Sequence, residues 1–253
     1  MFSTKPSEHW KAWGRKDPYY GVFSDEKFRT GTLDARAKEE FLASGVKEIE
    51  SALALVRARL APGFAPQRAL DFGCGVGRLT LPLARVCAEA VGVDISTAML
   101  EEAARNAREA GLANVRWVES DPALSRVEGT FDFIYSVIVF HHIRPADGYA
   151  LLRRLSALLR PGGVLSVQVI TVLHQSLPVQ AARWVQARVP LANQVVNLLR
   201  RRPLDTPNME ANVYSLPVVF ELLREAGCPG AWADFQRSPE CTHAALFAQR
   251  REA

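Results

Sequence analysis

Three glycines on alternate positions follow a short apolar stretch and carry the strongest chemical signal of the chain. The segment reads R-A-L-D-F-G-C-G-V-G-R-L-T over residues 68–80. A strand that runs into a glycine-rich turn and a helix is how an open α/β sheet builds a nucleotide site, because glycine lets the backbone approach a ligand closely. The segment therefore predicts a nucleotide-type ligand at Gly73–Gly77.

The spacing of the glycines and the acidic residue before them select among such ligands. The dinucleotide pattern G-x-G-x-x-G would place its third glycine at position 78, where this chain has Arg78. Asp71 at the strand end would put a carboxylate beside a phosphate, which is unfavourable. The same carboxylate suits a ligand with an ammonium and a sulfonium group. These features favour S-adenosylmethionine.

At these residues the sequence resembles the class I S-adenosylmethionine-dependent methyltransferases, and within them the small-molecule, UbiE-like group. The first motif of the class has the form apolar-D/E-x-G-x-G-x-G. The resemblance implies that the turn binds the cofactor through Asp71, Phe72, Gly73, Cys74, Gly75 and Gly77.

A second apolar segment, A-V-G-V-D-I-S over residues 90–96, ends in an acidic residue about 20 positions beyond the glycines. A carboxylate at this place accepts hydrogen bonds from ribose hydroxyls. Asp94 has an alternative role as the N-cap of a helix expected over 97–111, a role that Ser96 fills equally well. By the resemblance Asp94 binds the ribose, and Ile95 and Met99 pack on the adenine.

The strand expected at Val115–Val118 runs into E-S-D-P-A. The resemblance assigns the adenine amino group to Asp121 here, with Pro122 and Ala123 beside it. Asp-Pro is also an ordinary turn signal.

Two further segments resemble the fourth and fifth motifs of the class. F-D-F-I-Y-S at 131–136 continues as V-I-V-F-H-H-I, which by the resemblance brings Ser136 and Val137 to the cofactor. L-L-R-P-G-G-V-L at 158–165 matches a helix end, a turn and a strand. The resemblance implies a Rossmann-like α/β fold, a seven-stranded mixed sheet of order 3-2-1-4-5-7-6 with the seventh strand antiparallel. We expect helices at 146–159 and 216–226 and the last two strands at 231–236 and 243–249.

Composition limits the class of protein. With 253 residues, 48% of them hydrophobic, the chain can bury one large core, so we expect one domain, which by the resemblance is a methyltransferase domain. Its parts are an N-terminal arm with lid helices (1–60), a cofactor-binding core (68–170), a cap insertion (171–214), and a C-terminal helix and hairpin (215–250). The net charge of +4 is too small and scattered for a nucleic-acid surface.

No apolar run approaches the length of a membrane span, and the N-terminus has no apolar signal region. The four cysteines form no C-x-x-C pair, so we expect reduced thiols, no metal site and a cytoplasmic protein. Either a monomer or a homodimer fits the sequence.

Two segments are placed to cover the active edge of the sheet. The N-terminal arm is rich in aromatic residues and forms either a lid or an anchor on the core; its substrate candidates are Trp13, Tyr19 and Tyr20. The insertion is too long for a plain connection. Its apolar residues fall at helical spacing over 177–188 and 191–202. As a substrate cap it would contribute His174, Trp184 and Tyr214, and its alternatives are a dimer contact or a membrane-surface contact through the Arg202 end.

Methyl transfer from a sulfonium needs alignment and exclusion of water more than it needs acid-base groups. A general base is required only if the acceptor must lose a proton, and His141 and His142 are the candidates after the fourth strand. A structural or adenosine-side role is their alternative. The sequence predicts methyl transfer to oxygen or nitrogen of a small molecule. A nucleic-acid methyltransferase, a non-catalytic S-adenosylmethionine-binding protein and a nicotinamide oxidoreductase are the competing functions.

Overall fold

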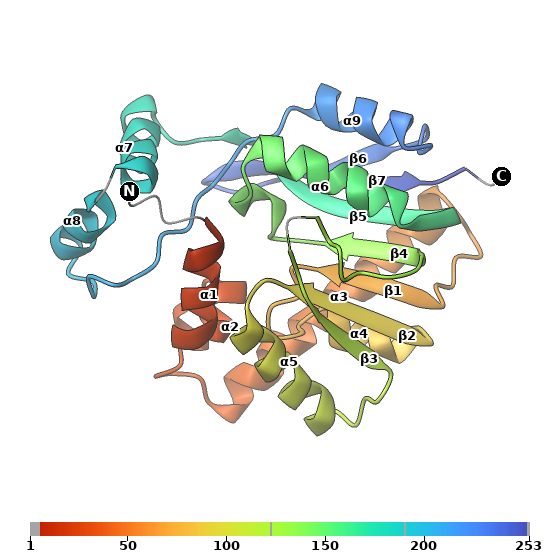
Figure 1. Cartoon of the computed structure of the whole chain (residues 1–253), viewed down its shortest axis with the longest axis horizontal. Helices are drawn as coiled ribbons and strands as arrows, with labels where there is room; N and C mark the ends of the chain where they lie inside the picture. Colours follow the sequence, from red (N-terminus) through yellow and green to blue (C-terminus); the bar gives the residue numbers. More distant parts are fainter. Residues whose placement is uncertain (1–5, 122, 190, 252–253) are drawn as a thin grey trace.

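The computed structural model describes residues 6–121, 123–189 and 191–251. At its centre lies a seven-stranded sheet with the order β3-β2-β1-β4-β5-β7-β6 (Figure 1). Strand β7 lies antiparallel between β5 and β6, whereas β1 to β5 pair in parallel. The expected fold is confirmed. The strands are β1 Arg68–Phe72, β2 Glu89–Asp94, β3 Val115–Glu119, β4 Phe131–Ser136, β5 Leu159–Leu173, β6 Trp232–Arg237 and β7 Cys241–Gln249.

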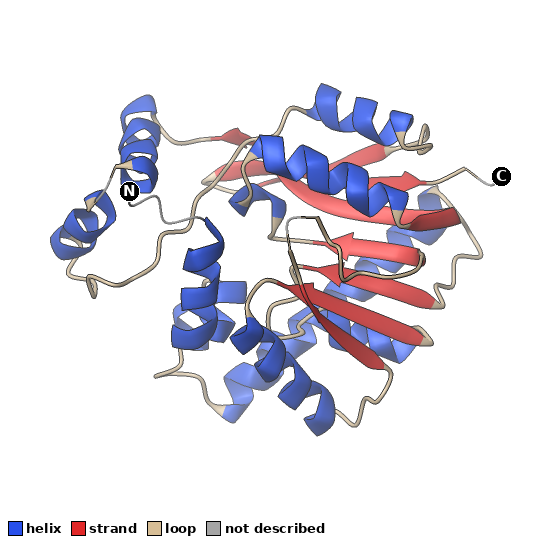
Figure 2. Cartoon of the chain, in the orientation of Figure 1, coloured by secondary structure: helices blue, strands red, loops and turns tan. Residues whose placement is uncertain are grey.

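Helices cover both faces of this sheet (Figure 2). The described helices are α1 Pro6–Lys16, α2 Pro18–Val22, α3 Ala35–Arg59, α4 Thr80–Val86, α5 Thr97–Glu109, α6 Pro145–Ala157, α7 Leu177–Arg188, α8 Ala192–Leu199 and α9 Leu216–Glu225, with short 3-10 turns at Glu26–Phe28 and Phe140–His142. Successive strand residues point to opposite faces. Thus Phe133 packs in the core with α3 and α4, and its neighbour Ile134 packs in the core with α6 and α9.

The glycine turn and the histidine pair emerge at one edge of the sheet. Strands β1 and β4 are parallel neighbours, so the turn that follows β1 and the 3-10 turn that follows β4 lie beside each other. This is the switch point of a doubly wound sheet, where such folds leave a crevice. The N-terminal helices α1 and α2 lie along the same edge, next to α5 (Figure 1).

Element boundaries differ from the sequence expectation by one to three residues, most clearly at the ends of β5 and α8. Strand β5 continues through Leu173 because it pairs with β7 as far as Cys241. Helix α8 ends at Leu199 rather than at residue 202, since Arg201 adopts a left-handed backbone conformation with φ 54°. None of the helices within the described ranges is both long and apolar enough to cross a membrane.

Candidate active site

Two cavities meet at the carboxyl edge of the sheet. The smaller, of about 120 Å³, lies on the glycine turn and is called here the donor cavity. The larger, of about 1570 Å³, lies between the N-terminal arm, β5, β7 and the insertion, and is called here the acceptor cavity. Gly21, Val22, Ile138 and His142 line both, so they form the border between the two.

One carboxylate holds the middle of the glycine turn. Asp94 accepts a hydrogen bond from the Gly75 amide at 3.0 Å and another from the Ser96 amide at 2.9 Å. Gly75 has a φ of 52°, and a Cβ there would lie 2.3 Å from Cγ2 of Val22 on helix α2. The absence of a side chain therefore lets the N-terminal arm close directly over the turn.

The sequence allowed Asp94 to be either the N-cap of helix α5 or a ligand of the ribose, and the N-cap role belongs to another residue. The Ser96 hydroxyl accepts the Met99 amide at 3.4 Å and is the N-cap. Asp94 faces the donor cavity instead, together with Ile95 and Met99. The carboxylate is thus placed where a ribose would need it, beside an apolar surface.

Two opposite charges are buried on the donor cavity. The Asp71 carboxylate accepts the Thr80 hydroxyl at 2.6 Å, and its burial raises its pKa to about 6. Burial also lowers the pKa of the Arg78 guanidinium, whose Nε has no hydrogen-bond partner within the described part of the chain. A buried guanidinium with an unpaired nitrogen is costly unless an anionic group completes it.

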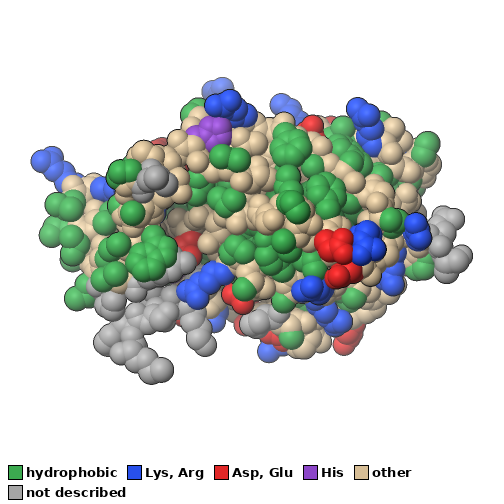
Figure 3. Space-filling model, turned by 90° about the horizontal axis from the view of Figure 1, so that it is seen from above, with side chains coloured by type: hydrophobic (Ala, Val, Ile, Leu, Met, Phe, Trp, Pro, Cys, Tyr) green, Lys and Arg blue, Asp and Glu red, His purple; other side chains and the backbone are tan. Residues whose placement is uncertain are grey.

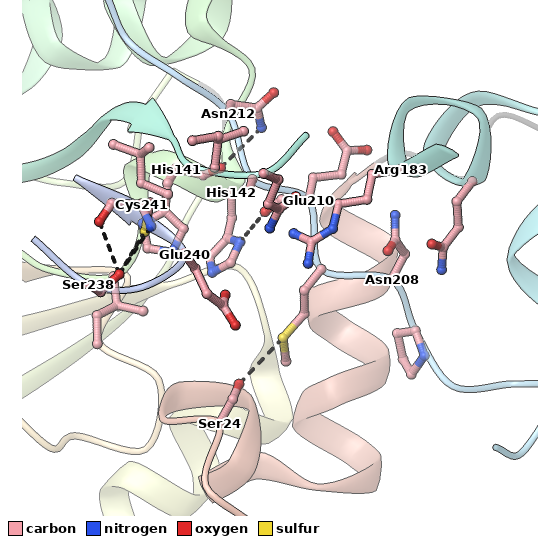
Figure 4. A pocket seen from close by; sticks show the side chains of 18 of the residues that line it. Ser24, His141, His142, Arg183, Asn208, Glu210, Asn212, Ser238, Glu240 and Cys241 are labelled. Carbon is pink, nitrogen blue, oxygen red and sulfur yellow. Dashed lines mark hydrogen bonds between the residues drawn. The ribbon is translucent and has the colours of Figure 1, made fainter. Parts of the chain in front are cut away.

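The two histidines of the turn after β4 differ in their surroundings (Figure 4). Nδ1 of His142 lies 2.6 Å from the carbonyl oxygen of Glu210. Because a carbonyl only accepts, Nδ1 carries the proton and Nε2 keeps its lone pair. Burial lowers the pKa of His142 to about 4, so the ring is neutral near pH 7. The Trp10 ring packs against it with a centroid distance of 4.6 Å.

The segment that returns from the insertion holds this histidine turn. The Asn212 amide and side-chain nitrogen both donate to the His141 carbonyl, at 2.7 and 3.1 Å. The buried Tyr214 hydroxyl lies 2.9 Å from the carbonyl oxygens of Phe140 and Ile143, on either side of the pair. The position of His142 therefore depends on residues 210–214.

Several buried polar atoms along the acceptor cavity lack a partner within the described residues. They are Nε1 of Trp13, Nδ1 of His141, Oε1 of Gln175 and Nδ1 of His243. Burial, followed by the neighbouring His142 and His243, lowers the pKa of His141 well below its usual value. Unpaired buried polar atoms that share one cavity indicate a ligand with its own donors and acceptors. No set of three His, Cys, Asp or Glu side chains converges as a metal site in the described ranges.

Comparison with known proteins assigns the family. A family model described as a methyltransferase domain matches residues 69–163. A ubiquinone biosynthesis O-methyltransferase from Parvibaculum lavamentivorans is 30% identical over 191 residues, which cover 75% of this chain and 68% of that protein. The chain belongs to the class I S-adenosylmethionine-dependent methyltransferases. A protein with the same description from Cereibacter sphaeroides is 28% identical over 60% of this methyltransferase and 66% of its own length.

Solved structures agree with the fold of this methyltransferase. Magnesium protoporphyrin IX methyltransferase of Synechocystis PCC 6803, crystallised with S-adenosylhomocysteine, superposes with a TM-score of 0.64 at 19% identity, covering 97% of this chain and 100% of that one. The N-methyltransferase NodS of Bradyrhizobium japonicum, also in complex with S-adenosylhomocysteine, gives 0.57 at 14% identity, covering 96% and 99%. At these identities the likeness concerns the fold alone.

The residues of the donor cavity fit S-adenosylmethionine. The unpaired Nε of the buried Arg78 provides a partner for a carboxylate, and the Asp71 carboxylate provides one for an ammonium. The lone pairs of Asp94 that its two amide bonds leave free can accept ribose hydroxyls. A dinucleotide phosphate would instead lie beside two buried carboxylates, which is unfavourable.

Most residues expected to bind the cofactor come together. The donor cavity is lined by Asp71, Phe72, Gly73, Cys74, Gly75, Asp94, Ile95, Met99 and Val137. Gly77 and Ser136 lie outside its lining. A Cβ at Gly77 would meet the Trp117 ring at 3.1 Å, and the Ser136 hydroxyl donates to the Phe72 carbonyl at 2.8 Å. Both therefore have packing roles.

The loop after β3 differs from the expectation. The partly exposed Asp121 carboxylate accepts the amides of Ala123 and Ser125 at 2.9 and 3.0 Å and also the Ser125 hydroxyl. These bonds lower its pKa. Asp121 and Ala123 do not line the donor cavity, whereas Ser120 does. The turn role of Asp-Pro is thus the one observed, and Pro122 itself lies outside the described residues.

The substrate candidates divide into two groups. Trp13, Tyr20 and Trp184 line the acceptor cavity, as do His141 and His142. The other three do not line it, and each side chain has a partner elsewhere. Tyr19 bonds Glu102 and Asn106 on α5, His174 bonds the Thr242 hydroxyl, and Tyr214 holds the histidine turn. The N-terminal arm is therefore both an anchor, through Tyr19, and a cover, through Trp10 and Val22.

Sequence reasoning missed Arg78, although its neighbours were identified. In the glycine pattern position 78 matters only as the place of an absent glycine, and the available signal is a cation directly after the glycines. The border residue Ile138, with a φ of 63°, gave no sequence signal because β-branched residues rarely adopt this conformation.

Replacing Asp94 with alanine should weaken S-adenosylhomocysteine binding by about 1.5–3 kcal/mol, because hydrogen bonds to a charged group are lost. Isothermal calorimetry measures this change. Asp34→Ala is a matched control, since Asp34 accepts the Ala37 amide at 2.7 Å at the start of α3, outside both cavities. Equal affinities for the Asp94 variant and the unchanged protein would contradict the ribose assignment.

Stability should fall in acid partly through His142. Its folded-state pKa of about 4 lies below the usual 6.5, so between these values the unfolded chain binds more protons than the folded chain. The free energy of unfolding then decreases as the pH falls through this window. Between pH 7.5 and 5 the free energy of unfolding, measured by urea titration, should fall by about 1–2 kcal/mol more in the unchanged protein than in the His142→Gln variant. Equal decreases in the free energy of unfolding of the two proteins would show that His142 is not held neutral.

Proposed function

We propose that this methyltransferase methylates a hydroxyl oxygen of a small-molecule acceptor in the acceptor cavity, with His142 as general base. The observation that carries the proposal is the place of His142 on the border of the two cavities, with its tautomer set by the Glu210 carbonyl. Any reacting pair held in the two cavities would meet at this border. The unprotonated Nε2 has the protonation state that a base requires.

In this proposal the donor cavity orients S-adenosylmethionine, which supplies an electrophilic methyl group when bound. Arg78 binds the carboxylate, Asp94 binds the ribose, and Ile95 with Met99 contacts the adenine. Trp10 and Val22 close the cavity from the N-terminal arm and exclude water. The contribution of the chain is chiefly alignment in a dry site.

The low pKa of His142 limits which acceptor hydroxyls it can deprotonate. An imidazole with a pKa of about 4 is a weak base, so proton removal accompanies methyl transfer rather than preceding it. An acceptor hydroxyl that is itself fairly acidic suits such a base better than an aliphatic alcohol does. The unpaired polar atoms of Trp13, His141 and His243 would bind further polar groups of the same molecule.

The competing functions differ in what they require. An amine acceptor that is neutral at the working pH needs no base. A nucleic-acid substrate would need a continuous cationic surface around the site, whereas the acceptor cavity carries both signs of charge: Glu210 and Glu240 line it together with Arg29, Arg183, Arg200, Arg202 and Arg237. A non-catalytic binding protein would bind S-adenosylmethionine and release no S-adenosylhomocysteine with any acceptor.

Replacing His142 with glutamine should lower turnover about 10²- to 10⁴-fold, the usual contribution of a general base. Glutamine keeps a donor for the Glu210 carbonyl, so S-adenosylhomocysteine affinity should stay within about twofold, because cofactor binding does not use the proton transfer. The assay measures S-adenosylhomocysteine release with a panel of phenols, hydroxy acids and amines.

His141→Gln serves as the comparison, because it alters a cavity residue without touching the proposed base. It should raise KM more than it lowers kcat. Full turnover by His142→Gln on an oxygen acceptor would exclude the base role, and turnover on amines alone would favour nitrogen methylation.

A further inference from the structure

Helix α8 has its polar face turned toward the protein. Asn197 is buried, and its side-chain nitrogen donates to the Thr206 carbonyl at 2.9 Å. Asn193, one turn earlier, donates to the same carbonyl at 2.9 Å. A surface helix normally buries its apolar residues and exposes its polar ones. In α8 this arrangement is reversed.

Three apolar residues of this helix, and the leucine that precedes it, face outward. Leu191, Leu198 and Leu199 are 71%, 67% and 78% exposed, and Val195 is exposed with them. Val195, Leu198 and Leu199 occupy positions i, i+3 and i+4, which fall on one side of the helix, and Leu191 is the N-cap residue directly before it. We call these four residues the α8 apolar face. Figure 3 shows hydrophobic side chains gathered at the end of the molecule that α7 and α8 form in Figure 1.

The charged residues next to this face in the sequence are all arginines. Between residues 171 and 204 the sequence contains arginines at 183, 188, 200, 201 and 202 and no aspartate or glutamate. Arg200, Arg201 and Arg202 are exposed and directly follow α8. The next acidic residue, Asp205, forms an ion pair with Lys16 at 2.6 Å. Exposed leucines with adjacent arginines are typical of helices that lie in the headgroup region of an anionic bilayer.

We propose that the α8 apolar face docks on an anionic lipid bilayer. Leu191, Leu198 and Leu199 enter the boundary between headgroups and acyl chains, and the arginines after α8 contact the lipid phosphates. The contact is peripheral. It goes beyond methyl transfer. The leucines line neither cavity, whereas Arg200 and Arg202 are also at the rim of the acceptor cavity.

Two other occupants fit this face less well. A second copy of the chain in a two-fold contact would bring the same patch onto itself, so Arg200–Arg202 would lie near their own counterparts. Such like-charge contacts are repulsive. Closure of α8 onto the acceptor cavity would not cover the leucines either, because the asparagines are on the cavity side.

The test is sedimentation of the full chain with phosphatidylcholine vesicles and with the same vesicles containing phosphatidylglycerol. The protein should pellet with the anionic vesicles and not with the neutral ones. Raising NaCl from about 0.1 to about 1 M shortens the Debye length from ~10 to ~3 Å and should release it. Replacing Arg200–Arg202 with glutamine should weaken binding on the order of a hundredfold.

The variant Leu198→Glu/Leu199→Glu should lower vesicle partitioning at least about tenfold, since it removes the apolar insertion. Val86→Glu is the matched control, because Val86 is an exposed apolar residue at the far end of α4. Both variants should keep the S-adenosylhomocysteine affinity of the unchanged protein, which shows that they fold.

Three results would overturn the proposal. One is equal sedimentation with neutral and anionic vesicles, and another is unchanged binding by the leucine variant. The third is a dimer in light scattering that the leucine variant dissociates while no vesicle binding occurs, which would assign the face to a second copy.

Discussion

The donor cavity depends on the carboxylate of Asp94, which joins two neighbouring strands where they end. One oxygen accepts the Gly75 amide from the turn after β1, and the other accepts the Ser96 amide at the start of α5, after β2. Because both partners are backbone groups, these two bonds help to fix the shape of the turn, together with the bonds from the Gly73 and Cys74 amides to the Val93 carbonyl. The same carboxylate faces the cavity, so the group that shapes the site is also available to bind in it.

The second constraint acts on the other side of the cavity. The turn that carries His141 and His142 is held from residues 210–214 by Asn212, Tyr214 and the Glu210 carbonyl. These residues close the insertion that includes α7 and α8. A change in the position of the insertion would therefore move His142, which links the cover of the acceptor cavity to the border with the donor cavity.

Much of the fold and of the donor cavity could be predicted from sequence, because each strand end carries a local signal. Glycines, an acidic residue or a histidine pair follow β1, β2 and β4, and parallel strands bring those ends together. Side-chain direction beyond the strands could not be predicted. Tyr214 and Trp184 both lie in an aromatic-containing insertion, yet one is buried against the histidine turn and the other lines the cavity. Likewise, the helical spacing of apolar residues in α8 predicts an apolar face, but it does not predict whether that face packs against the protein or is exposed to solvent.

The central claim is that the two cavities hold the methyl donor and the methyl acceptor on either side of His142. A crystal structure of the protein with S-adenosylhomocysteine tests this directly. We predict that the ribose hydroxyls contact Asp94, that the carboxylate contacts Arg78, and that the sulfur faces His142 and the acceptor cavity. A ribose away from Asp94, or a sulfur directed away from the acceptor cavity, would contradict the account.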